Sequence, residues 1–166
     1  KIAFTGSTEV GKQVMAGCAD QVKAVTLELG GKSANVVFAD SDLEKAATTA
    51  PYAVFENAGQ DCCARSRILV ERSVYDRFME LLEPAVKGVV VGAPGDPATE
   101  MGPLVSKAHF DAVSAYVPDD AAVAFRGSKP DGPGYWFAPT VLTPSSRTDP
   151  AVIAIARRSL RGPIVD

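Results

Sequence analysis

The sequence predicts an α/β fold with a mainly parallel sheet flanked by helices. Short runs rich in apolar and β-branched residues alternate with segments in which apolar residues recur at helical spacing. Glycine-containing turns separate several of these runs from the segment that follows. The composition is that of a globular chain, with 46% hydrophobic and 22% charged residues. A length of 166 residues allows one domain and part of another.

Charge and cysteine content exclude several other classes of protein. The net charge of −3 disfavours nucleic-acid binding, which needs a basic face. No apolar run approaches the roughly 20 residues of a membrane span, so we expect no membrane partner. No leader pattern is visible, and three cysteines do not form a disulfide framework. These features predict a protein of the reducing cytoplasm.

The first half of the chain reads as strands separated by two helices. Residues 1–5 are typical of the end of a buried strand, and residues 9–18 of a helix capped by Ser7 or Thr8. Two further strands follow, at 23–28 and at 34–38, the second apolar enough to be buried on both faces. A helix from 42 to about 57 is capped by Ser41 or Asp40 and is interrupted by Pro51.

The second half continues the alternation. A strand at 66–70 precedes a helix at 75–90, whose apolar face comprises Phe78, Leu81, Leu82, Val86 and Val89. A Gly- and Pro-rich loop at 94–103 leads to a helix at 107–116 and a strand at 121–125. A polar turn at 127–134 precedes an extended apolar segment at 135–142.

Two adjacent thiols, Cys62 and Cys63, lie just after Gly59-Gln60, where the preceding helix is expected to end. A thiol in such a turn is accessible, and neighbouring cations such as Arg65 and Arg67 favour the nucleophilic thiolate. The alternative is that they are small buried residues, the interpretation we adopt for Cys18 on its helix. A single histidine, His109, beside dispersed cysteines does not predict a zinc site.

Two other features have both a chemical and a structural interpretation. Glu28 stands between leucines, so desolvation should raise its pKa and suit it to act as a general base; a salt-bridged glutamate is the alternative. Residues 4–11 form a strand, a tight turn and a helix start whose backbone N–H groups suit a phosphate. Strand–Gly–helix turns are common, however, and this one lacks the GxGxxG pattern.

Together, these segments resemble the motif series of the NAD(P)-dependent aldehyde dehydrogenase superfamily. The matching segments are Phe-Thr-Gly-Ser-Thr-Glu-Val-Gly at 4–11, Leu-Glu-Leu-Gly-Gly-Lys-Ser at 27–33, and residues 55–67 around the thiols. Two more segments resemble the family, Met-Gly-Pro-Leu-Val at 101–105 and Tyr-Trp-Phe-Ala-Pro-Thr-Val-Leu at 135–142. The resemblance covers residues 1 to about 149.

The resemblance implies specific roles. Cys62 corresponds to the catalytic nucleophile, two residues after the Gly-Gln pair, and Glu28 to the general base. The residues implied in binding NAD or NADP are Thr5, Gly6 and Ser7 near the pyrophosphate, Val10 near the adenine, and Leu29 and Gly31 at the nicotinamide end. The implied reaction oxidises a small-molecule aldehyde to a carboxylic acid through a thiohemiacetal and a thioester on Cys62.

The resemblance also implies boundaries. Residues 1–27 correspond to the end of a Rossmann-like cofactor domain, and residues 28–166 to an aldehyde-dehydrogenase-like catalytic domain. We expect the sequence to be truncated at both ends relative to the family. The parent enzyme would be a homodimer or homotetramer, and the 166-residue polypeptide alone would have little or no turnover.

One segment departs from the family pattern. Gly162-Pro163 matches the end of a Glu-Glu-Ile-Phe-Gly-Pro motif, but residues 156–161 lack its glutamates. A local frameshift over residues 155–161 is our hypothesis for this departure. Two alternatives to the oxidising enzyme remain open at this point: an inactive remnant of such an enzyme, and a relative that releases its thioester to coenzyme A.

Overall fold

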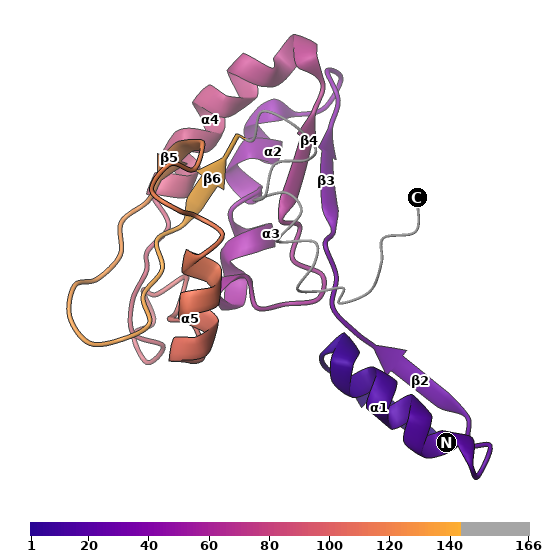
Figure 1. The fold of residues 1–166 in the computed structure, drawn as a ribbon. Helices are drawn as coiled ribbons and strands as arrows, with labels where there is room; N and C mark the ends of the chain where they lie inside the picture. Colours follow the sequence, from indigo (N-terminus) through magenta and orange to yellow (C-terminus); the bar gives the residue numbers. More distant parts are fainter. Residues whose placement is uncertain (144–166) are drawn as a thin grey trace.

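The computed structural model describes residues 1–143 as three pairs of strands with five α-helices around them (Figure 1). The hypothesis of a frameshift at residues 155–161 lies outside the described residues. The predicted α/β class is confirmed. The strands form separate two-stranded units, of which two are parallel and one is antiparallel.

The first unit is a β–α–β arrangement. Strands β1 (Ile2–Thr5) and β2 (Val25–Glu28) pair in parallel, and helix α1 (Thr8–Ala19) connects them. The predicted cap is confirmed for Ser7, whose Oγ accepts a hydrogen bond from the Val10 N–H at 3.3 Å. The expectation that β1 is buried is wrong, since three of its four residues are exposed.

The second unit pairs β3 (Ala34–Val37) in parallel with β4 (Arg67–Val70). The prediction that β3 is buried on both faces is wrong. Val37 is buried, but Val36 and the following Phe38 are more than half exposed, so burial alternates as in a strand with one packed face.

Two helices and a short 3₁₀ turn connect these strands. Helix α2 (Leu43–Thr49) is capped by Asp42, whose carboxylate accepts from the Lys45 N–H at 3.0 Å. The predicted caps Asp40 and Ser41 are therefore wrong; the Ser41 hydroxyl instead donates to the Phe38 carbonyl. The predicted interruption at Pro51 is confirmed, and helix α3 (Tyr52–Phe55) and the 3₁₀ turn η1 (Glu56–Gly59) follow it.

The core lies where α2 packs against the long helix α4 (Tyr75–Lys87), which follows the 3₁₀ turn η2 (Arg72–Val74). Phe78, Leu82 and Val86 form one stripe of α4 and are at most 1% exposed. Burying each such side chain contributes roughly 1.5–3 kcal/mol, so this stripe is a main source of stability. The helix ends at Lys87, three residues before the predicted end, and Gly88 is its C-cap.

The last unit packs beside α4. Helix α5 (Lys107–Ser114) precedes strand β5 (Val123–Arg126), which pairs antiparallel with β6 (Thr140–Leu142). The predicted extended segment at 135–142 is thus a regular strand only at its end. Within residues 1–143, no helix has the length and apolar character needed to cross a membrane.

Candidate active site

The two adjacent thiols lie in an exposed turn between η1 and β4. Cys62 and Cys63 are both free and exposed, as a reactive thiol requires. Cys18, by contrast, is 7% exposed in α1, which confirms its predicted role in packing. The structure therefore separates the cysteines into one buried residue and one accessible pair.

The backbone before this turn has an unusual conformation. Asn57, Ala58 and Gly59 follow one another with φ values of 52°, 55° and 71°, all in the left-handed region. This region is costly for alanine, and strained residues of this kind cluster at functional sites. The sequence indicated only that a helix ends near Gly59. The left-handed conformation of Ala58 could not be predicted from its residue type.

Gln60 connects the thiol turn to a loop 45 positions away in the sequence. Its Oε1 accepts a hydrogen bond from the Val105 N–H at 2.9 Å, and its Nε2 donates to the Asn57 carbonyl at 3.0 Å. The same loop is joined to the next segment, since the Leu104 N–H donates to the Tyr135 carbonyl at 3.0 Å. Gln60 was not among the predicted site residues.

The Leu-Glu-Leu-Gly-Gly segment lies directly against the thiol turn. A Cβ atom at Gly31 would overlap the backbone carbonyl oxygen of Cys62 and lie 3.2 Å from its carbonyl carbon. Only glycine permits this approach. The adjacent backbone is also fixed, because Arg67 donates from Nε and Nη2 to the Lys32 carbonyl at 3.1 and 2.7 Å. Arg67 is thus engaged in holding this junction.

The predicted phosphate-binding turn lies at the other end of the same segment. Thr5 and Glu28 are register partners in β1 and β2, and the Gly6 N–H donates to the Glu28 carbonyl at 3.0 Å. Gly6 and Ser7 are exposed at the start of α1. The predicted cofactor residues of this unit therefore share one edge with the candidate base.

Two further predicted cofactor residues flank this turn. Val10 is 41% exposed on α1, so its side chain is accessible to a ligand. Leu29 is half-buried, and its Cδ2 lies so close to Gly11 that a Cβ there would approach it to 2.7 Å. Leu29 thus packs α1 onto the end of β2.

Glu28 itself is exposed, at the end of β2. The expectation that its leucine neighbours desolvate it is wrong in this structure. Side chains alternate across a strand, so Leu27 points to the half-buried face and Glu28 to the open one. The carboxylate is accessible to water and to any ligand at this edge.

Asp61 lies against the Cys63 thiol in this turn. Its Oδ1 accepts from the Cys63 N–H at 3.3 Å, and its Oδ2 lies 3.3 Å from Cys63 Sγ. The hydrogen bond from the thiol to Asp61 and the negative charge of Asp61 raise the pKa of Cys63. Cys63 is consequently held as the protonated thiol, the weaker nucleophile.

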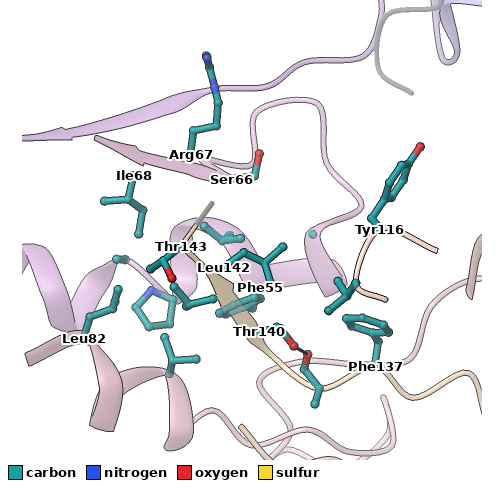
Figure 2. Close-up of a pocket in the computed structure, with 18 of the residues that line it drawn as sticks. Phe55, Ser66, Arg67, Ile68, Leu82, Tyr116, Phe137, Thr140, Leu142 and Thr143 are labelled. Atoms are coloured by element: carbon teal, nitrogen blue, oxygen red, sulfur yellow. Dashed lines mark hydrogen bonds between the residues drawn. The ribbon is translucent and has the colours of Figure 1, made fainter. Parts of the chain in front are cut away.

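A cavity of about 660 Å³ lies behind the turn, between α3, α4, α5 and strands β4 and β6 (Figure 2). Its wall is mainly apolar, and Figure 2 shows Phe55, Ile68, Leu82, Phe137 and Leu142 around it. Arg67 extends away from the cavity in this view. Neither Cys62 nor Glu28 lines it, so the cavity is distinct from the candidate reacting groups.

Comparison with known proteins decides the family. The family model described as "Aldehyde dehydrogenase family" matches residues 1–165, almost the whole chain. The chain belongs to the aldehyde dehydrogenase family. An aldehyde dehydrogenase of Emericella nidulans is 40% identical over 170 residues, which cover 99% of this chain and 33% of that protein. Human retinal dehydrogenase 2 is 43% identical over 169 residues, covering 99% and 32% respectively.

Solved aldehyde dehydrogenase structures share the fold of the chain. Betaine aldehyde dehydrogenase from Staphylococcus aureus, in complex with NAD⁺, matches 90% of this chain and 31% of its own length, with a TM-score of 0.80 and 38% identity. An aldehyde dehydrogenase from Bacillus cereus (E194S mutant) matches 92% and 32%, with a TM-score of 0.83 and 41% identity. The chain spans about a third of the length of these relatives.

Proposed function

We propose that this aldehyde dehydrogenase chain carries the nucleophile and the base of an enzyme that oxidises an aldehyde to a carboxylic acid with NAD⁺ or NADP⁺. The observation that carries the proposal is the close approach of Gly31 to Cys62, which places the Leu-Glu-Leu-Gly-Gly segment against the exposed thiol turn. This junction unites the two segments that, by family resemblance, supply catalysis. Residues 1–27 then belong to the cofactor domain and residues 28–166 to the catalytic domain.

Cys62 is the proposed nucleophile. Its thiolate adds to the aldehyde carbonyl carbon and forms a thiohemiacetal, which loses hydride to give a thioester. Two observations support Cys62 over its neighbour. Cys62 contributes its carbonyl to the junction with Gly31, and Asp61 raises the pKa of Cys63 and so keeps that thiol protonated.

Glu28 is the proposed general base. It accepts a proton from water, and the oxygen of that water attacks the thioester carbonyl, which releases the acid and restores the Cys62 thiol. Exposure at the end of β2 supports this role, because the base must meet solvent. Transfer of the acyl group to coenzyme A would not require this base.

The turn between β1 and α1 fits a dinucleotide. A parallel β–α–β unit with an exposed Gly6-Ser7 turn at the start of a 12-residue helix offers backbone N–H groups to a pyrophosphate. Thr5, Gly6 and Ser7 would hold this group, and Val10 leaves an accessible apolar side chain for the adenine. When bound, the nicotinamide supplies the hydride acceptor. The NAD⁺ complex of the Staphylococcus aureus relative supports this assignment.

A chimaeric enzyme tests the proposal. Because the chain spans a third of its relatives, the 166-residue polypeptide alone should show little or no turnover. Residues 1–143 should therefore replace the matching segment of the Bacillus cereus aldehyde dehydrogenase, free of its E194S substitution. We expect aldehyde-dependent reduction of NAD⁺ or NADP⁺ by the chimaera, and a loss of at least about 10³-fold in kcat with Cys62→Ala.

Matched variants make the outcome specific. Cys63→Ala should retain most of the activity, since Cys63 lies in the same turn but is not the nucleophile. Glu28→Gln should reduce kcat by about 10²–10⁴-fold. Full activity of Cys62→Ala, or equal losses in both cysteine variants, would contradict the assigned nucleophile.

A further inference from the structure

The thiol turn also brings together three side chains of the types that ligate metal ions. Asp61, Cys62 and Cys63 each present one ligand atom, and these atoms all lie within 4.8 Å of one another. All three residues are exposed, so an ion in solution has direct access. Within residues 1–143, this is the one group of three or more Asp, Glu, His or Cys side chains whose ligand atoms lie close enough together to hold an ion. The sequence did not predict a zinc site, because the cysteines were taken to be dispersed and Asp61 was not counted as a ligand.

The carboxylate is oriented toward the thiols. The Cys63 N–H donates to Asp61 Oδ1 at 3.3 Å, which leaves Oδ2 facing the Cys63 sulfur at 3.3 Å. A tetrahedral ion with bonds of about 2.0–2.3 Å separates its ligand atoms by roughly 3.5–3.8 Å. The distance from Asp61 Oδ2 to Cys63 Sγ is near this value, and all three ligand atoms lie within 4.8 Å of one another, so side-chain rotations that bring Cys62 Sγ to the same spacing would complete the coordination.

We propose that Asp61, Cys62 and Cys63 bind one thiophilic divalent cation of the Zn²⁺ class. Two sulfur donors and one oxygen select such an ion over Mg²⁺ and Ca²⁺, which prefer oxygen ligands. Each thiol releases its proton to solvent as its sulfur coordinates. Three protein ligands leave a fourth position for water, as in open zinc sites.

This site has a regulatory consequence that rests on the proposed function. A cation bound to Cys62 Sγ withdraws electron density from the sulfur and blocks the approach of the aldehyde to it. Binding of the ion and nucleophilic attack therefore exclude each other, and removal of the ion by a chelator restores the free thiol. Metal occupancy would act as a reversible block of the nucleophile.

Cadmium binding to the 166-residue chain tests the site without any need for turnover. Cd²⁺ is titrated into the purified chain under anaerobic conditions with a thiol-free reductant, and the thiolate-to-cadmium absorption band is followed. We expect one Cd²⁺ per chain, and binding at least about 10-fold weaker in Asp61→Asn and in Cys63→Ser. Competition with Zn²⁺ should remove the band, whereas excess Mg²⁺ should leave it.

Cys18→Ser is the matched control, because Cys18 is a free cysteine buried in α1. Its affinity for Cd²⁺ should equal that of the unsubstituted chain. The proposal is overturned if Asp61→Asn and Cys63→Ser bind as tightly as the unsubstituted chain, or if Cys18→Ser loses binding equally. Circular dichroism of each variant confirms that the exposed substitutions leave the fold intact. Failure here leaves the chimaera result unaffected, so the two proposals are tested separately.

Discussion

Replacing Gly31 with alanine tests the junction on which the candidate site depends. The added methyl group would overlap the Cys62 carbonyl oxygen, a backbone atom that cannot rotate away. Atoms at such a spacing must separate, and the shift needed is on the order of 1 Å. Overpacking of this kind costs about 1–3 kcal/mol. Gly31→Ala should therefore lower the free energy of unfolding of the chain by this amount.

Gly17 provides the matched control. It lies within α1, it is exposed, and a Cβ there would meet no atom within 4 Å apart from the neighbouring helix backbone. Gly17→Ala should raise the free energy of unfolding by about 0.5–1 kcal/mol, because alanine favours a helix over glycine. The same substitution thus has opposite expected signs at two positions in one chain.

Urea denaturation followed by circular dichroism measures both variants, with the midpoint and slope fitted together. In the chimaeric enzyme, a displacement of the thiol turn by 1 Å should also reduce kcat by about 10²-fold in Gly31→Ala. If Gly31→Ala were as stable as Gly17→Ala and retained full activity, the close approach of Gly31 to Cys62 would not exist as described.

Three further predictions follow from the same geometry. Asp61→Asn should lower the pKa of Cys63, because the hydrogen bond to the Asp61 carboxylate and the negative charge of Asp61, which raise this pKa, are lost. The pH dependence of iodoacetamide modification of Cys63, mapped by mass spectrometry, should then move to lower pH, and an unchanged profile would count against these causes. Gln60→Ala should lower the free energy of unfolding by about 1–2 kcal/mol, because two side-chain hydrogen bonds are lost. Gln13→Ala, on the exposed face of α1, should change this free energy little in the same urea titration. Burial and, to a smaller extent, the charge of Arg67 lower the pKa of Lys32 from 10.5 to about 8. Between these two pH values the unfolded chain binds more protons than the folded chain, so the free energy of unfolding should rise with pH from about 8 to 10.5. Lys32→Met should abolish that rise, and an identical pH dependence in the two chains would refute the assignment.

Much of the local structure was predictable because short-range signals determine it. Ser7 caps α1 because its hydroxyl reaches an N–H three residues away, and the stripe of Phe78, Leu82 and Val86 follows from helical spacing. The exposed turn around Cys62 follows from the glycine before it. Each of these features depends on residues within about two helical turns of one another.

Burial was less predictable than helix or strand identity. Glu28 stands between two leucines in the sequence, yet it is exposed because alternate side chains of a strand point to opposite faces. Val36 and Phe38 are apolar and nevertheless exposed, because β3 packs on one face only. The apolar run alone does not say how many faces of its strand other elements cover.

The sequence by itself determined the order of the motifs, the thiol pair and the helix that carries the core. The tertiary structure alone decided which of these segments meet. Gln60 reaches Val105 across 45 positions, and Gly31 meets the Cys62 carbonyl across 31. Such contacts follow from how the elements pack in space, which no local periodicity encodes. The residue types of the thiol turn are therefore given by the local sequence, whereas the position of the turn against the Leu-Glu-Leu-Gly-Gly segment depends on the folding of the whole chain.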